Sequence, residues 1–150
     1  MNYEQNAWIQ SIYKSSLLDG ITLAKFVENF KFSISGKCIC VDIVEGAILN
    51  ELLINDGYPY FKPDNFLQLL RKPVAVEWMD IYVSSTSLAI SHENSYEQIL
   101  PQADLLIRAV DGGYIYTYIP CMSGDSKIKI SNFDAIEVIK ASISELSFPG

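Results

Sequence analysis

Apolar side chains recur at helical spacing twice within the first thirty residues. They are Trp8, Ile9, Ile12 and Tyr13 in residues 4–18, then Leu23, Phe26, Val27 and Phe30 at i, i+3, i+4 and i+7. Asp19-Gly20 separates the two sets and is a typical helix boundary. The pattern therefore predicts two N-terminal amphipathic helices.

Further helices are expected later in the chain, each from a cap residue and an apolar stripe. Residues 47–53 are a candidate short helix, Asp64 caps a helix that runs to Leu70, and Ser95 caps one turn that ends near Pro101. Ser131 is the expected cap of a C-terminal helix, whose apolar face carries Ile136, Ile139, Ile143 and Leu146.

Strand signals occupy the middle of the sequence. In residues 36–44, Ile39, Val41 and Ile43 alternate with Cys38, Cys40 and Asp42. Residues 74–83 are long, β-branched and aromatic, and shorter strands are expected at 87–91 and 127–130. The segment 55–63 holds two prolines and a glycine, so it is expected to be a loop.

The clearest local signal is a hairpin in residues 104–119, turning at Asp111-Gly112-Gly113. A three-residue loop pairs Val110 with Tyr114, Arg108 with Tyr116 and Leu106 with Tyr118. That register gathers aliphatic side chains on one face and tyrosines with arginine on the other. A two-residue loop mixes the two sets, and because a slip of one residue exchanges the faces, the cleaner segregation favours three.

Helices and strands alternate without regular βαβ repeats, so we expect one α+β domain over residues 1–150. Its mainly antiparallel sheet would be packed by N-terminal and C-terminal helices. With 150 residues and 49% hydrophobic side chains the chain is large enough to build its own core.

Charge is distributed unevenly along the chain. Residues 38–126 carry twelve acids and four bases, whereas the flanks together sum to +1. An acidic chain with pI near 4.6 repels nucleic acid and anionic membranes. No apolar run approaches the roughly 20 residues that span a bilayer, and no signal peptide opens the chain, so we expect a cytoplasmic protein.

No motif for a cofactor, metal or nucleophile is visible. Cys38, Cys40 and Cys121 are odd in number and are expected to be reduced thiols, and a zinc site with His92 would need an unusual Cys-x-Cys spacing. His92 is expected to be a solvated loop residue. Carboxylate pairs such as Glu77 with Asp80, or Glu93 with Glu97, are the remaining candidates for acid-base chemistry. We expect no cofactor, no metal and no enzyme.

The candidate site is a surface that binds a partner protein. Between Pro73 and Ile107 the acids have no lysine or arginine among them, and the hairpin adds a row of tyrosines as stiff contact area. The candidate residues are Glu77, Asp80, Glu93, Glu97, Asp104, Tyr114, Tyr116 and Tyr118. The alternative is that a helix covers the tyrosines and the acids serve solubility.

In size, acidity and α+β character, and in lacking catalytic motifs, the whole chain resembles the immunity proteins of bacterial polymorphic toxin systems, including contact-dependent growth inhibition. The resemblance implies a stoichiometric inhibitor that occludes the active site of a basic toxin, often a nuclease. Two alternatives stay open. One is an acidic, dimeric secretion chaperone that binds an effector segment, and the other is a small carboxylate-dependent enzyme.

Overall fold

The computed structural model describes residues 7–16, 18–47, 60–72, 75–86, 88 and 94–150. The strands are β1 (Ala7–Lys14), β2 (Cys38–Ala47), β3 (Tyr60–Phe61), β4 (Ala75–Ser84), β5 (Leu105–Val110), β6 (Tyr114–Pro120) and β7 (Ala135–Ser142). The helices are α1 (Gly20–Glu28), α2 (Lys31–Ile34), α3 (Pro63–Leu70) and α4 (Tyr96–Ile99), with short 3-10 turns at Leu100–Gln102, Gly124–Lys127 and Ile143–Glu145.

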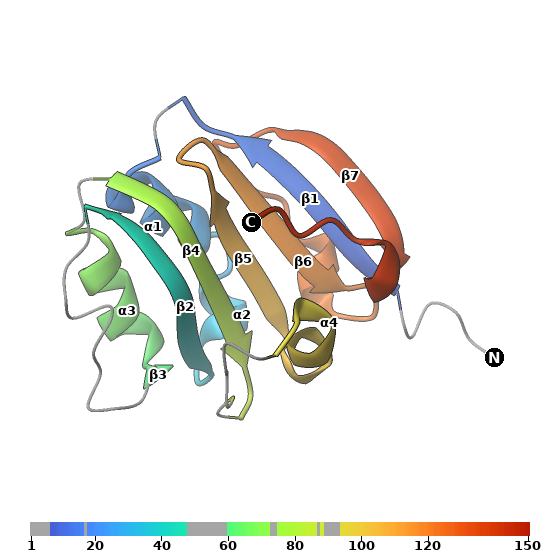
Figure 1. Ribbon diagram of the computed structural model, residues 1–150. Coiled ribbons are helices and arrows are strands. Elements are labelled where there is room, and N and C mark those ends of the chain that lie inside the picture. The colour runs from blue at the N-terminus through green and yellow to red at the C-terminus, as the bar shows by residue number, and fades with distance from the viewer. Residues whose placement is uncertain (1–6, 17, 48–59, 73–74, 87, 89–93) are drawn as a thin grey trace.

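The strands form one antiparallel sheet in the order β3-β2-β4-β5-β6-β1-β7, and the fold is α+β as expected. Helices α1, α2 and α3 cover one face, which we call the helical face (Figure 1). Helix α4 and the C-terminal segment 146–150 lie on the other, which we call the tyrosine face because β6 directs Tyr114, Tyr116 and Tyr118 to it.

Each face of the sheet has its own apolar core. On the helical face, aliphatic residues of the strands pack against the buried stripe of α1, which includes Leu23, Phe26 and Val27. On the tyrosine face, Tyr82, Leu106 and Tyr118 pack with residues of α4 and of the C-terminal segment. The central strands are therefore buried on both sides, which is why β5 is apolar at almost every position.

The hairpin has the predicted three-residue register. Val110 pairs with Tyr114, Arg108 with Tyr116 and Leu106 with Tyr118. Asp111 and Gly112 in the turn have φ of 53° and 68°. Gly112 N–H also donates to the carbonyl of Glu77 at 3.0 Å, which ties the turn to β4. The predicted separation of aliphatic and tyrosine-arginine faces is confirmed.

Several other expected elements are confirmed. Residues 23–28 lie in α1, which Asp19 caps, and the Ser95 cap forms a complete capping box with Gln98. The helix expected at 64–70 is α3, although it begins with Pro63 at its first turn and its N-cap is Lys62, not Asp64. Strands β2 and β4 correspond to the predicted strands at 36–44 and 74–83.

The two terminal helices were wrong predictions. Residues 7–14 form β1, an inner strand between β6 and β7, and residues 135–142 form β7 at the edge of the sheet. Residues 127–130 end a 3-10 turn and continue as irregular chain, not as a strand. The helix expected at 47–53 and the strand expected at 87–91 fall almost wholly outside the described residues.

Candidate interaction surface on the tyrosine face

One row of side chains crosses the tyrosine face from β2 to β7. Directly paired residues point to the same side of a sheet, so the register alone defines this row. Its members in order are Asp42, Asp80, Arg108, Tyr116, Ile12 and Glu137. The outermost residue, Glu137, is exposed, whereas Asp80 and Arg108 in the middle are 1% and 0% exposed. The row thus has a buried ion pair at its centre and a solvated acid at one end.

The buried ion pair is held by α4. Arg108 Nε donates to the Asp80 carboxylate at 2.7 Å, and the Tyr96 hydroxyl from α4 donates to its other oxygen. The Arg108 guanidinium carbon also lies 4.5 Å from the centre of the Tyr96 ring. The Ser95 capping box positions Tyr96, since it fixes the first turn of α4 at the edge of this cluster.

Burial governs the protonation of this cluster. Burial raises the pKa of the Asp80 carboxyl, and the Arg108 guanidinium acts against this increase. Burial alone would lower the pKa of Arg108, but the adjacent Asp80 carboxylate raises it, so the guanidinium keeps its charge. Burial also raises the pKa of the hydroxyls of Tyr82, Tyr96 and Tyr118. These phenols therefore stay protonated at neutral pH.

The C-terminal segment covers part of the tyrosine row. Phe148 stacks on Tyr96 at 4.7 Å and on Tyr118 at 4.9 Å between ring centres. The Tyr118 hydroxyl donates to the Ser147 carbonyl at 2.6 Å, and Ser147 N–H donates to the Gln10 side chain at 2.8 Å. The tyrosines are therefore covered partly by an extended segment and α4, not by a long helix.

The structure separates the predicted acids. Glu77 on β4 and Glu97 on α4 are exposed, whereas Asp80 lies in the core, so its expected exposure was wrong. Asp104 accepts a hydrogen bond from Ser85 at 2.8 Å and lies 3.4 Å from Lys37 Nζ, close to the helical face. Glu93 lies outside the described residues.

The predicted tyrosines also differ in exposure. Tyr114 and Tyr116 are half-buried, and Tyr118 is 0% exposed. Tyr116 and Tyr118 stack at 6.4 Å between ring centres. Among the three predicted tyrosines, Tyr114 and Tyr116 thus contribute accessible aromatic area, while Tyr118 belongs to the core.

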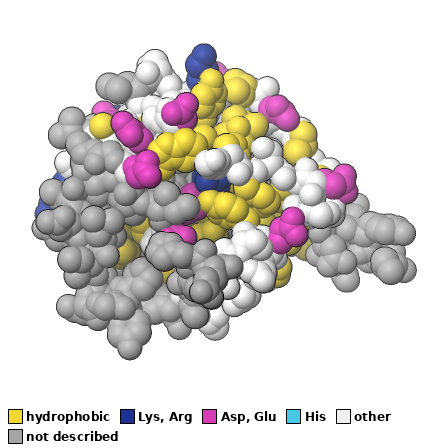
Figure 2. Space-filling view, in the orientation of Figure 1, with side chains coloured by type: hydrophobic (Ala, Val, Ile, Leu, Met, Phe, Trp, Pro, Cys, Tyr) yellow, Lys and Arg dark blue, Asp and Glu magenta, His cyan; other side chains and the backbone are white. Residues whose placement is uncertain are grey.

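Three further acids on this face were not among the residues predicted from the sequence. Asp42 pairs with Asp80, Glu45 pairs with Trp78, and Glu137 pairs with Ile12. Glu45 and Glu137 are exposed, and Asp42 is half-buried. The alternation in 36–44 gave a signal for Asp42, but Glu137 was assigned to a helix. Figure 2 looks onto this face and shows hydrophobic side chains at its centre, with acidic side chains around them and a basic side chain at the upper edge.

No catalytic or metal constellation appears in the described part of the chain. No three His, Cys, Asp or Glu side chains there converge on a metal position, and His92 is not among the described residues. The three cysteines are unbridged, and burial raises the pKa of the Cys40 thiol to about 12. The two described cavities are lined largely by residues of the helical side, and neither includes Asp42 or Asp80.

Comparison with protein-family models, curated proteins and solved structures finds no match for this chain. None of the helices in the described ranges is long and apolar enough to cross a bilayer.

Proposed function

We propose that the protein is a cytoplasmic inhibitor that binds and neutralises a basic toxin through its tyrosine face, as immunity proteins do. The observation that supports this most is the arrangement of that face. Half-buried Tyr116 lies near its centre and half-buried Tyr114 beside the hairpin turn, and exposed acids lie on β2, β4, α4 and β7. Aromatic anchors with a charged rim are typical of protein interfaces.

In the proposed complex, the acids supply electrostatic attraction and the tyrosines supply buried contact area. Glu77, Glu97 and Glu137 would meet lysines and arginines of the toxin and steer the encounter. Tyr114 and Tyr116 would supply contact area that loses water on binding. The buried Asp80–Arg108 pair would hold the strands beneath them in register and contact no partner directly.

The first test is capture of partners by the tagged chain from lysate of its source cells at low salt, with elution at increasing salt and identification by mass spectrometry. We expect one basic protein in stoichiometric amount. Recovery of no partner, or of a mixture of weakly held proteins, would contradict the inhibitor proposal. An effector bound only through an unfolded segment would instead favour the chaperone alternative.

The second test assigns the surface once that partner is known. The double substitution Glu97→Lys and Glu137→Lys should weaken the complex by more than tenfold, because each change replaces attraction with repulsion. The matched control, Asp64→Lys and Asp134→Lys, makes the same change in net charge at two other exposed positions. Equal effects of the two double variants would remove the tyrosine face as the binding surface.

A further inference from the structure

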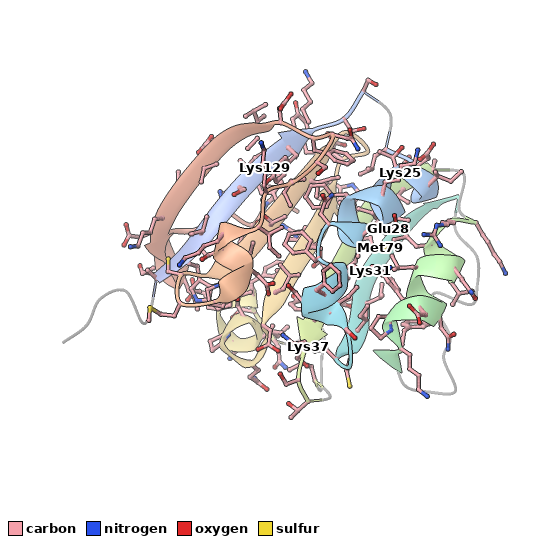
Figure 3. All side chains as sticks on the ribbon, turned by 180° about the vertical axis from the view of Figure 1, so that it is seen from behind. Lys25, Glu28, Lys31, Lys37, Met79 and Lys129 are labelled. Atoms are coloured by element: carbon pink, nitrogen blue, oxygen red, sulfur yellow. The ribbon has the colours of Figure 1, made fainter. Side chains whose placement is uncertain are left out.

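The helical face carries a groove that has no part in the proposed inhibitor surface. It lies between α2 and α3, has a volume of about 1130 Å³, and is partly open to solvent. Ile34 of α2 and Leu67 of α3 line it and are themselves largely buried. Figure 3 views the protein from this side, with Lys31 and Lys37 labelled at α2. The groove therefore has an apolar lining on the side opposite the proposed inhibitor surface.

The rim of this groove is basic although the chain as a whole is acidic. Among the described lining residues, Lys31, Lys37, Lys62 and Arg71 are basic, and Glu28 and Asp64 are the two acids. Arg71 pairs with Glu28, and Lys37 pairs with Asp104 at 3.4 Å. Both ion pairs are partly exposed to solvent, so they are weak and can exchange for a partner's carboxylates.

Two of these lysines have no acidic partner within the described residues. Lys31 of α2 and Lys62, the N-cap of α3, are exposed, line the groove, and take part in no ion pair there. Two such cations at one groove suit a segment that carries carboxylates at spaced positions.

An exposed aromatic ring adds to the site. Phe32, next to Lys31 on α2, is 94% exposed and also lines the groove. A fully solvated phenylalanine stabilises no core, and aromatic residues are enriched in protein interfaces. Beside an apolar groove it extends the contact area that a bound segment would cover.

We propose that this groove is a second docking site, which binds an acidic protein segment carrying apolar side chains. The carboxylates of the segment contact Lys31 and Lys62, and its apolar side chains cover the exposed Phe32 ring. This inference is independent of the inhibitor proposal, because it concerns the opposite face and a partner of opposite charge.

The chemistry of the groove favours such a segment over other anions. A nucleic acid is repelled by a chain of net charge −7, and stacking of successive bases needs several aromatic side chains, whereas Phe32 is the single aromatic residue among the described residues that line this groove. At about 1130 Å³ the groove also exceeds the 300–1,000 Å³ of most small-molecule pockets.

The test is selection of a phage-displayed library of random 12-residue peptides on the full chain, with counter-selection on the Lys31→Glu/Lys62→Glu variant. We expect enriched peptides that combine two or more acids with apolar residues. Synthetic copies should bind the charge-reversed variant more than tenfold more weakly, and Phe32→Ser should weaken binding about threefold. The matched control, Lys127→Glu/Lys129→Glu, changes the same charge at exposed positions outside the groove and should change the affinity by less than twofold.

Three results would overturn the proposal. They are failure to enrich any peptide over the counter-selection, enrichment of peptides without acids, and equal loss of affinity in the groove and control variants. A 12-nucleotide oligothymidylate measured in the same assay is the fourth check, since tighter binding of that probe would assign the groove to nucleic acid. Thermal melting of each variant establishes that all are folded.

Discussion

Arg108 is fully buried, and its charge is balanced almost entirely by Asp80 on the neighbouring strand. Its Nη1 atom and the Tyr82 hydroxyl are buried and have no hydrogen-bond partner among the described residues, which adds to the cost of burying this cluster. Removing one member of a buried ion pair leaves the other charge uncompensated, which is far more destabilising than replacing both.

Asp80→Asn should therefore lower the free energy of unfolding by about 3–5 kcal/mol. The double variant Asp80→Leu/Arg108→Met should recover most of that loss, because it removes both charges and keeps the volume apolar. Urea unfolding of the three proteins measures both effects. If the free energy of unfolding of Asp80→Asn lies within about 1 kcal/mol of the wild-type value, the ion pair contributes little to stability.

Asp19 offers a second prediction, with a defined pH dependence. Its carboxylate accepts from Thr22 N–H at 2.7 Å and caps α1, and hydrogen bonding to Thr22 lowers the pKa of Asp19. A folded-state pKa below the unfolded one gives stabilisation that is present above about pH 4 and disappears as the pH falls through the folded-state value.

Asp19→Ala should thus cost about 1 kcal/mol at neutral pH, and the difference from the wild type should shrink in acid. Asp19→Asn is the control, because asparagine caps a helix without titrating. Thermal melting at pH 7 and at about pH 3 tests this prediction. A loss that is independent of pH would contradict the role assigned to the charged carboxylate.

At the scale of elements, the packing of the C-terminal segment on the tyrosine face can be tested through one side chain, Phe148. Phe148 stacks on Tyr96 and Tyr118, and it is only half-buried. Phe148→Ala should lower the unfolding free energy by about 1–2 kcal/mol and change the near-ultraviolet circular dichroism of the tyrosines. Phe148→Leu keeps most of the apolar area and should give less than half that loss. An unchanged spectrum in Phe148→Ala would mean that the stack does not persist in solution.

How far the sequence predicts each element depends on where that element packs. The hairpin was predicted to the residue because its two faces differ sharply in composition and its turn fixes the register. Strand β1 was mistaken for a helix because it is buried on both faces, and its apolar residues Trp8, Ile9, Ile12 and Tyr13 then fall at helical spacings by coincidence.

Strand β7 failed for a different reason. Ile136, Ile139 and Ile143 match a helical stripe, but Ile136 and Val138 are 59% exposed at the sheet edge. The β-branched content of Ala135–Ser142 was the signal that should have carried more weight. The ion pair at the candidate site was missed for a related reason. Asp80 meets Arg108 only because β4 pairs with β5, and local sequence patterns do not specify that pairing.

At the scale of the whole molecule, the balance of charge differs between the two faces. Exposed lysines and an arginine line the groove of the helical face, while exposed acids surround the tyrosines on the other face (Figures 2 and 3). The linear sequence showed only an acidic middle, because residues of both faces interleave along it. A molecule with this difference orients in the field of a charged partner before contact.

Orientation of this kind affects association rates more than dissociation rates. For the basic partner proposed above, the association rate constant should fall at least tenfold between about 20 mM and 300 mM salt, because screening shortens the reach of the acidic rim. In Glu97→Lys/Glu137→Lys both the rate at low salt and its salt dependence should decrease, while the melting temperature stays within about 2 °C because both side chains are exposed. Stopped-flow kinetics with Asp64→Lys/Asp134→Lys as the control measures this directly. If the salt dependence of the association rate constant falls equally in the two double variants, net charge governs the encounter and the acids of the tyrosine face have no special part in it.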